Sequence, residues 1–112
     1  CRRTFDFALE IVHLCRELSE ERGPARTLGR QLLRSGTSIG ANVEEAQAGQ
    51  SRADFVSKYA IARKEARETL YWLTLLRASG CSHSDGTDGL IDEADQLVSI
   101  LTAIIKKAES NA

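Results

Sequence analysis

The chain contains few of the residues that interrupt helices or favour β-sheets. Among 112 residues there is one proline, and aromatic residues make up only 5%. It also lacks the long alternating runs of β-branched residues that strands would require. Helix-favouring Ala, Leu, Glu and Arg predominate instead. The composition therefore predicts an all-α fold, and the length predicts a single domain over residues 1–112.

The chain also has few cysteines and no long apolar run. The three cysteines, Cys1, Cys15 and Cys81, are an odd number and fit neither a disulfide framework nor CxxC metal spacing. No apolar run approaches the length of about 18 residues that spans a membrane, and no signal-peptide pattern is visible. We therefore expect a cytoplasmic protein without membrane contact, in which Cys15 is a buried thiol. The chain begins at Cys1 rather than Met, which is consistent with further residues upstream.

An excess of charge of either sign is also lacking. Fifteen Lys and Arg residues face 16 Asp and Glu residues, which gives a net charge of -1. A nucleic-acid-binding domain is commonly strongly basic, so the overall charge does not favour that function. A local basic patch would still be sufficient for contact, because binding depends on the local field.

Apolar residues recur at helical spacing in four segments. The expected helices cover residues 4–22, 24–47, 52–78 and 88–110. Gly23 and Pro24 separate the first two helices, and Ser51 is the expected N-cap of the third. A loop rich in Gly, Ser and Asp covers residues 79–89. Four helices with short connections predict an up-down-up-down antiparallel four-helix bundle.

Each expected helix has an apolar face that should lie in the core. In the first helix this face consists of Phe5, Ala8, Leu9, Val12, Cys15 and Leu18. The second helix contains Gly36 and Gly40, which either allow close approach of another helix or mark a kink. We favour close packing, because the apolar period continues through both glycines.

Polar residues interrupt the apolar faces of the second and third helices. They are Arg34, Ser38, Asn42, Glu45, Glu65 and Glu68. Charged groups within an apolar face are costly unless they are paired, and an Arg can bind a carboxylate through two hydrogen bonds. We interpret these residues as a buried polar network that fixes helix register, and a ligand site is the alternative.

Basic residues form two clusters that could contact an anion or RNA. Arg26 and Arg30 are four residues apart on the second helix, and Arg63 and Lys64 lie on the third. Ordinary pairing with Glu along the helix is the alternative interpretation. No aromatic residues are interleaved with these clusters to stack on single-stranded bases. Contact with nucleic acid is therefore possible but not favoured.

The sequence offers no convincing catalytic or metal-binding pattern. Glu44, Glu45, Glu65 and Glu68 suggest a di-metal bundle, but no helix carries the Glu-x-x-His motif that such sites use. Arg77 and His83 are similar to the Arg…His motif of some helical-bundle ribonucleases, although Gly80 lies between them. A solvated loop histidine is the simpler interpretation, because no convergent partners are visible. We expect a protein that is not an enzyme and needs no cofactor or metal.

The second and third helices resemble a bacterial four-helix-bundle family that includes the proteins encoded in 23S rRNA intervening sequences. The resemblance covers about residues 28–76. The matching residues are Gln31, Arg34, Ser35, Ser38, Ile39, Asn42, Val43, Glu45, Ser51, Arg52, Phe55 and Glu68. This chain has Glu44 where the family usually has Ala, Ala46 where Gly is usual, and Lys64–Glu65 where small residues are common.

The resemblance implies a left-turning bundle that forms homo-oligomers, often pentameric rings. One related branch, the accessory variability determinants of diversity-generating retroelements, binds a reverse transcriptase and nucleic acid and is usually strongly basic. The expected function is therefore a self-associating binding or scaffold module. The alternative is an RNA-binding accessory protein that partners a reverse transcriptase or ribosomal RNA. A helical-bundle ribonuclease or metal-dependent enzyme is the least favoured.

Overall fold

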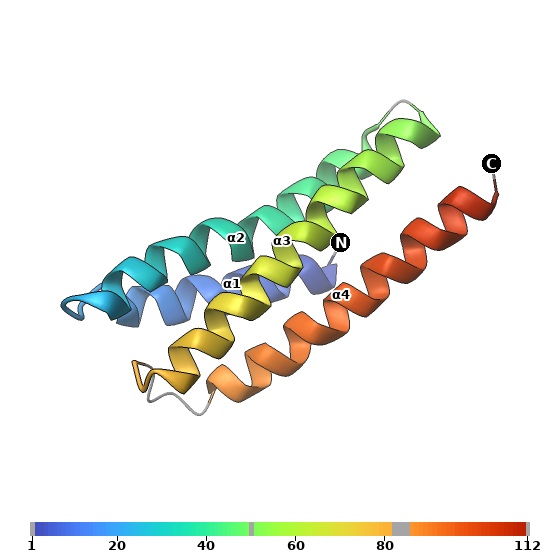
Figure 1. The fold of residues 1–112 in the computed structure, drawn as a ribbon. Helices are drawn as coiled ribbons and strands as arrows, with labels where there is room; N and C mark the ends of the chain where they lie inside the picture. Colours follow the sequence, from blue (N-terminus) through green and yellow to red (C-terminus); the bar gives the residue numbers. More distant parts are fainter. Residues whose placement is uncertain (1, 50, 82–85, 112) are drawn as a thin grey trace.

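Four α-helices make up almost all of the protein in the computed structural model, which describes residues 2–49, 51–81 and 86–111. They are α1 (Arg2–Leu18), α2 (Pro24–Gln47), α3 (Arg52–Ala78) and α4 (Gly86–Ser110). The predicted all-α antiparallel bundle is confirmed (Figure 1). Among the described residues, no helix is long and apolar enough to cross a membrane.

Local signals in the sequence account for most helix ends. The predicted bounds of the second and third helices agree with α2 and α3. The hydroxyl of Ser51 accepts a hydrogen bond from the backbone N–H of Asp54 at 3.1 Å, so the predicted N-cap is confirmed. The first helix ends earlier than expected, at Leu18, because a polar turn follows and Gly23 adopts a φ of 73°.

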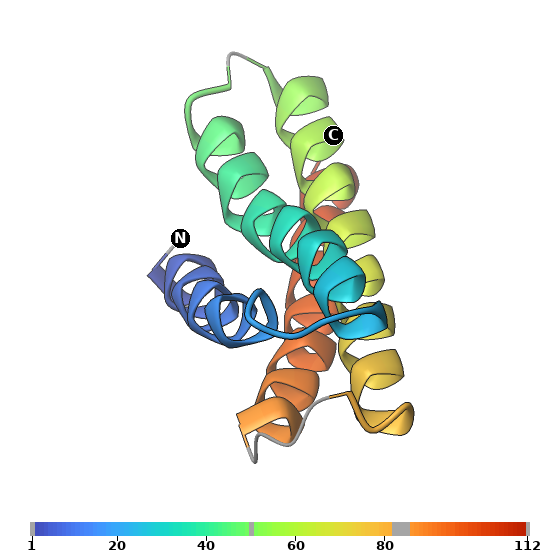
Figure 2. The ribbon, with the colours of Figure 1, turned by 90° about the vertical axis from the view of Figure 1, so that its left-hand side faces the viewer.

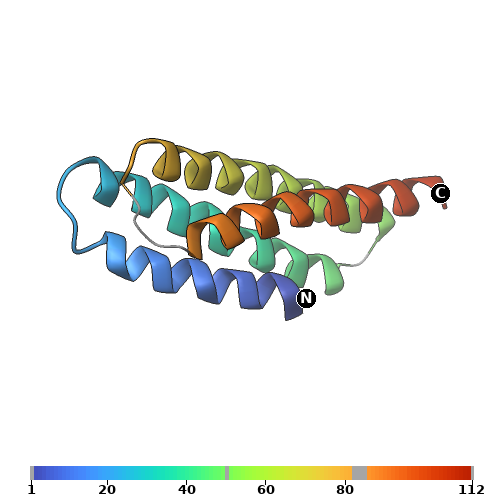
Figure 3. The same ribbon diagram turned by 90° about the horizontal axis from the view of Figure 1, so that it is seen from below.

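The bundle is elongated, with extents of 48 × 20 × 20 Å, and its four sides are unequal. Helix α2 packs between α1 and α3, and α3 packs between α2 and α4, whereas α1 and α4 touch only sparsely. Figures 1 and 2 show α1 beside α2 on one side of the molecule. Figure 3 shows that α4 continues well beyond the first residues of α1. The α1–α4 side is therefore the loosest part of the bundle.

The buried face of α1 differs from the predicted one. Phe5 is 57% exposed and Leu9 is 47% exposed, whereas Phe7 and Ile11 are almost completely buried. The prediction was wrong because α1 carries apolar residues on two faces, and helical spacing alone does not show which face meets the neighbouring helices. The core instead takes the face that includes Cys15 and Leu18, the two predicted residues that are buried.

Close packing between α1 and α2 depends on small residues of α2. A Cβ atom on Gly36 would lie 2.8 Å from Cγ2 of Ile11, and one on Gly40 would lie 3.5 Å from the backbone of Thr4. Helix α2 continues through both glycines without a break. The prediction of close packing rather than a kink is therefore confirmed, and Gly36 leaves the space that Ile11 fills.

Candidate functional site

A small ion-pair cluster connects α2 to α3, and we call it the Arg34 cluster: Arg34, Glu65, Glu68 and Trp72. Nη1 of Arg34 lies 3.2 Å from Oε2 of Glu65, and its Nη2 contacts Oε2 of Glu68. The indole N–H of Trp72 donates to the same Glu68 oxygen at 3.0 Å. One guanidinium on α2 thus links two carboxylates that lie one helical turn apart on α3.

The Arg34 cluster lies at the edge of the protein rather than deep inside it. The side chain of Arg34 is half exposed, whereas that of Glu65 is only 12% exposed. Because its charge is already balanced by two carboxylates, Arg34 is poorly suited to bind a further anion. The arrangement joins α2 to α3 at a defined register and has the character of a structural contact.

Among the residues that the structure describes, two other predicted members of the network form their side-chain hydrogen bonds within α2. The Ser38 hydroxyl donates to the carbonyl of Arg34 at 2.6 Å, and the Asn42 amide donates to the carbonyl of Ser38 at 2.9 Å. Such bonds to the preceding turn satisfy the side chain locally, so neither residue bridges to a carboxylate of α3.

The prediction that Glu45 belongs to a buried network is wrong. Its side chain is 67% exposed and lies 3.6 Å from Nζ of Lys58. Eleven residues separate Glu45 from Arg34, which is about 16 Å along a helix, so the two side chains cannot meet although they share a face.

The most deeply buried polar contact was not part of the predicted network. The hydroxyls of Ser35 and Thr69 lie 3.0 Å apart, and both residues are completely buried between α2 and α3. Because both residues lie within the apolar faces of their helices, the sequence could have indicated that their hydroxyls are buried. A buried hydroxyl needs a partner, and besides this contact the Thr69 hydroxyl lies 2.7 Å from the carbonyl of Glu65 and the Ser35 hydroxyl lies 3.4 Å from the carbonyl of Leu32.

The predicted basic contacts lie on two different helices. Arg26 and Arg30 are exposed on α2, while on α3 Lys64 is exposed and Arg63 is partly buried. None of these four side chains has an ion-pair partner among the described residues. They remain available for contact with an anion.

Of the residues considered for catalysis, only Arg77 lies in the part of the chain that the structure describes. Arg77 forms an ion pair with Asp88 at 2.7 Å, and His83 lies outside the described residues, as does Cys1. Cys15 is buried as predicted, and burial raises the pKa of its thiol to about 11, which keeps it protonated and unreactive. Among the described residues, no group of His, Cys, Asp and Glu could hold a metal ion.

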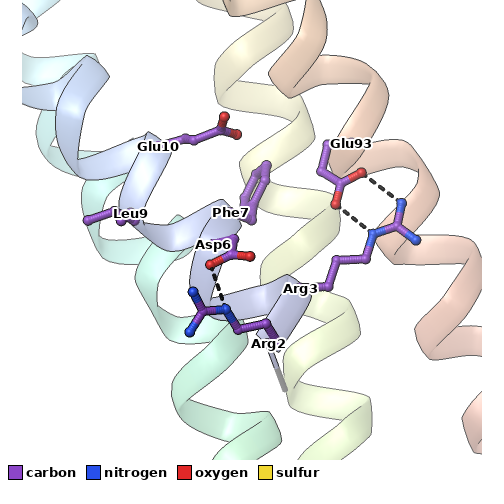
Figure 4. A pocket seen from close by; sticks show the side chains of 7 residues that line it. All are labelled: Arg2, Arg3, Asp6, Phe7, Leu9, Glu10 and Glu93. Atoms are coloured by element: carbon purple, nitrogen blue, oxygen red, sulfur yellow. Dashed lines mark hydrogen bonds and ion pairs between the residues drawn. The ribbon is translucent and has the colours of Figure 1, made fainter.

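Sequence reasoning did not identify the cleft between α1 and α4. It has a volume of about 650 Å³ and is lined by residues of α1 together with Glu93 of α4 (Figure 4). Arg3 reaches across it and binds Glu93 through two hydrogen bonds of 2.7 Å, while Arg2 pairs with Asp6 at 3.2 Å. A second cavity of about 380 Å³ continues along the same side and includes Glu10 and His13.

Arg3 and Glu93 shift each other's pKa across the cleft. The hydrogen bond with Arg3 lowers the pKa of Glu93, and the same bond raises the pKa of Arg3. Each shift favours the charged form of its group. The pair spans the side on which α1 and α4 have few other contacts, so it acts as a clasp between these helices.

Comparison with known proteins points to one family. The family model described as 23S rRNA-intervening sequence protein matches residues 1–103. A crystal structure of a protein of unknown function from the S23 ribosomal protein family of Bacteroides thetaiotaomicron VPI-5482 is similar in sequence and fold. Its identity is 40%, its TM-score is 0.85, and the match covers 94% of this chain and 96% of that chain. No curated protein matches this chain at a significant level.

Proposed function

Because the chain belongs to the 23S rRNA-intervening sequence protein family, we propose that it is a non-enzymatic binding or scaffold module that associates with copies of itself. The similar crystal structure is of a protein of unknown function, and the surface of this chain supports the proposal. The ion pairs between α2 and α3 and those in the α1–α4 cleft support a structural role for the charged residues, which leaves the apolar surface as the candidate for binding.

The observation that carries this proposal is the exposure of large apolar side chains. Among the described residues, those exposed are Phe5, Leu9, Leu33, Ile61 and Tyr71. The first three lie on α1 and α2, and the other two lie on α3. Apolar surface of this kind is commonly covered in a protein–protein contact. Apolar groups on separate helices would allow assembly to continue beyond a pair, and closed rings, including pentamers, are one such assembly.

Light scattering at micromolar concentration tests self-association directly. We expect a mass that is a multiple of the 12.3 kDa of one chain, and a mass that falls on dilution. A mass of one chain over the whole concentration range would refute the proposal.

A second candidate function is that of an RNA-binding accessory protein that partners a reverse transcriptase or ribosomal RNA. It is favoured by Arg26 and Arg30, which are exposed on one helix and have no ion-pair partner among the described residues. Association of several copies would gather these positive charges into a larger basic surface. Against it stands the net charge of -1 for the chain.

A further inference from the structure

The face of α1 that is turned toward α4 carries a row of charged and apolar residues. Arg3, Glu10 and Glu17 are seven residues apart, so they share this face. Phe7 and Leu14 come between them in the sequence, and both are buried. Glu10 and Glu17 therefore lie about 10 Å apart along the helix axis, beside an apolar floor.

Among the described residues, only the first charged residue of this row has an ion-pair partner on α4. Arg3 binds Glu93, which forms the clasp. Glu10 and Glu17 are exposed and have no ion-pair partner among the described residues. Figure 4 shows Glu10 on the side of α1 that faces α4. Helix α4 contains no Lys or Arg before Lys106, so it offers no cation opposite these two carboxylates.

Opposite the two unpaired carboxylates, α4 has small residues instead. Gly86, Gly89 and Leu90 of α4, together with Leu14 and His13 of α1, line the cavity of about 380 Å³, which we call the α1–α4 groove. A Cβ atom on Gly89 would have nothing within 4 Å, and its φ is not positive. A glycine inside a helix costs about 1 kcal/mol relative to Ala, and neither packing nor backbone conformation requires it here. The space beside Gly89 is therefore open to a side chain from outside the bundle.

The charges and the shape of the α1–α4 groove fit a helix that carries two cations. Residues seven apart share one face of a helix, so Lys or Arg at that spacing would lie opposite Glu10 and Glu17. A large apolar residue between the two cations would enter the space beside Gly89. Nucleic acid does not fit this groove, because its phosphates would face two unpaired carboxylates.

We infer that the α1–α4 groove is a docking site for a basic amphipathic helix of a partner protein. The inference rests on the proposed role as a binding module and names the partner's chemistry. None of the exposed large apolar residues assigned to self-association lines this groove. A copy that is bound to other copies can therefore also bind such a helix.

A synthetic helix is the probe for this docking site. The peptide is rich in alanine, carries two Arg residues seven positions apart, and has a Leu four positions after the first Arg, on the same face. A control peptide has Glu in place of both Arg residues. Fluorescence anisotropy with the full chain should show saturable binding of the Arg peptide and binding of the Glu peptide that is about tenfold weaker or more. Equal binding of the two peptides, or no saturable binding of the Arg peptide, would refute the docking site.

Charge reversal with a matched control locates the contact. Glu10→Lys and Glu17→Lys should each weaken binding of the Arg peptide about tenfold, and each should strengthen binding of the Glu peptide. Asp95→Lys makes the same change of charge at an exposed residue of α4 that does not line the groove, so it should leave both affinities unchanged. If all three variants act equally, the attraction is not specific to the groove and the inference is wrong.

Filling the groove gives an independent test. Gly89→Leu should fold, because its Cβ atom has free space, and circular dichroism with urea unfolding verifies this. The new side chain would occupy the position of the Leu of the peptide, so binding of the Arg peptide should fall about tenfold while the stability of the chain does not. Unchanged binding by a folded Gly89→Leu variant would place the helix elsewhere and overturn the inference.

Two further measurements separate the remaining outcomes. If arginine amide displaces the Arg peptide at the same concentration as the unlabelled peptide does, the groove takes a small organic cation and helix docking is refuted. Light scattering of the same samples reports self-association. If the chain associates but does not prefer the Arg peptide, the docking site is refuted and self-association stands. If the chain remains a single copy yet binds the Arg peptide selectively, self-association is refuted and the docking site stands.

Discussion

At the scale of single residues, Arg34 forms the predicted ion pair with a carboxylate, but the pair stabilises the fold less than a buried pair would. Its guanidinium binds Glu65 and Glu68, but its side chain is half exposed, so water weakens the ion pairs. Complete burial would have made the loss of one partner worth about 3–5 kcal/mol. Because Arg34 is half exposed, we expect its ion pairs to contribute much less to the free energy of unfolding.

We expect Arg34→Ala to lower the free energy of unfolding by about 1 kcal/mol, because half-exposed ion pairs contribute little. The Arg34→Ala and Glu68→Ala pair should show a coupling of about 0.5–1 kcal/mol in a double-mutant cycle measured by urea unfolding. Arg67→Ala is the control, since Arg67 is exposed without an ion-pair partner among the described residues. Strictly additive losses would show that Arg34 and Glu68 do not interact in solution.

At the scale of helices, the α1–α2 contact depends on the absence of a side chain at Gly36. A Cβ atom there would lie 2.8 Å from Cγ2 of Ile11, whose side chain is fully buried. Overpacking would cost about 1–3 kcal/mol and better helix propensity would return about 1 kcal/mol, so we expect Gly36→Ala to destabilise the protein.

Gly89 provides a matched control for this prediction. It lies in α4, and a Cβ atom there would have nothing within 4 Å. Gly89→Ala should therefore stabilise the protein by about 0.5–1 kcal/mol through helix propensity alone. Urea unfolding of both variants should show shifts of opposite sign. Equal shifts would argue against the close packing of α1 on α2.

The Arg3–Glu93 clasp between α1 and α4 makes a pH-dependent contribution to the stability of the fold. Because Arg3 lowers the pKa of Glu93, the folded state binds the proton of Glu93 less readily than the unfolded state does. The stabilisation is therefore present above the unfolded pKa and is lost as the pH falls through the lowered pKa of the folded state. Most of this change should occur in the acidic range.

Arg3→Ala tests the clasp without altering the core. The pKa of Glu93, followed by NMR titration of its carboxyl carbon, should rise toward the ordinary value for Glu. Amide exchange in α1 should also become faster, because few other contacts hold α1 to α4. Arg2→Ala is the control, since Arg2 pairs with Asp6 within α1. A Glu93 pKa that is unchanged by Arg3→Ala would contradict the clasp.

At the scale of the whole molecule, charge balance opposes tight binding to RNA. The chain has a net charge of -1, and phosphate binding requires several unneutralised Lys or Arg side chains. We expect weak or absent binding in fluorescence anisotropy with a structured RNA at two salt concentrations. Submicromolar binding that weakens steeply with salt and is abolished by Arg26→Ala with Arg30→Ala would favour the RNA-binding function instead.

The sequence alone determined the helical architecture of this protein. Apolar periodicity, Pro24 and the Ser51 cap predicted the extents of α2 and α3, because helix formation and capping depend on residues close together in the chain. The same periodicity correctly placed Gly36 within the packed face of α2.

Only the tertiary structure decided which face of each helix packs against the neighbouring helices. It buried Phe7 and Ile11 rather than Phe5 and Leu9, and it paired Arg34 with carboxylates of α3 rather than with Glu45. The physical reason is that periodicity shows which residues share a face, whereas pairing also depends on the rotation and register of neighbouring helices. Those are set by the joint packing of all four helices.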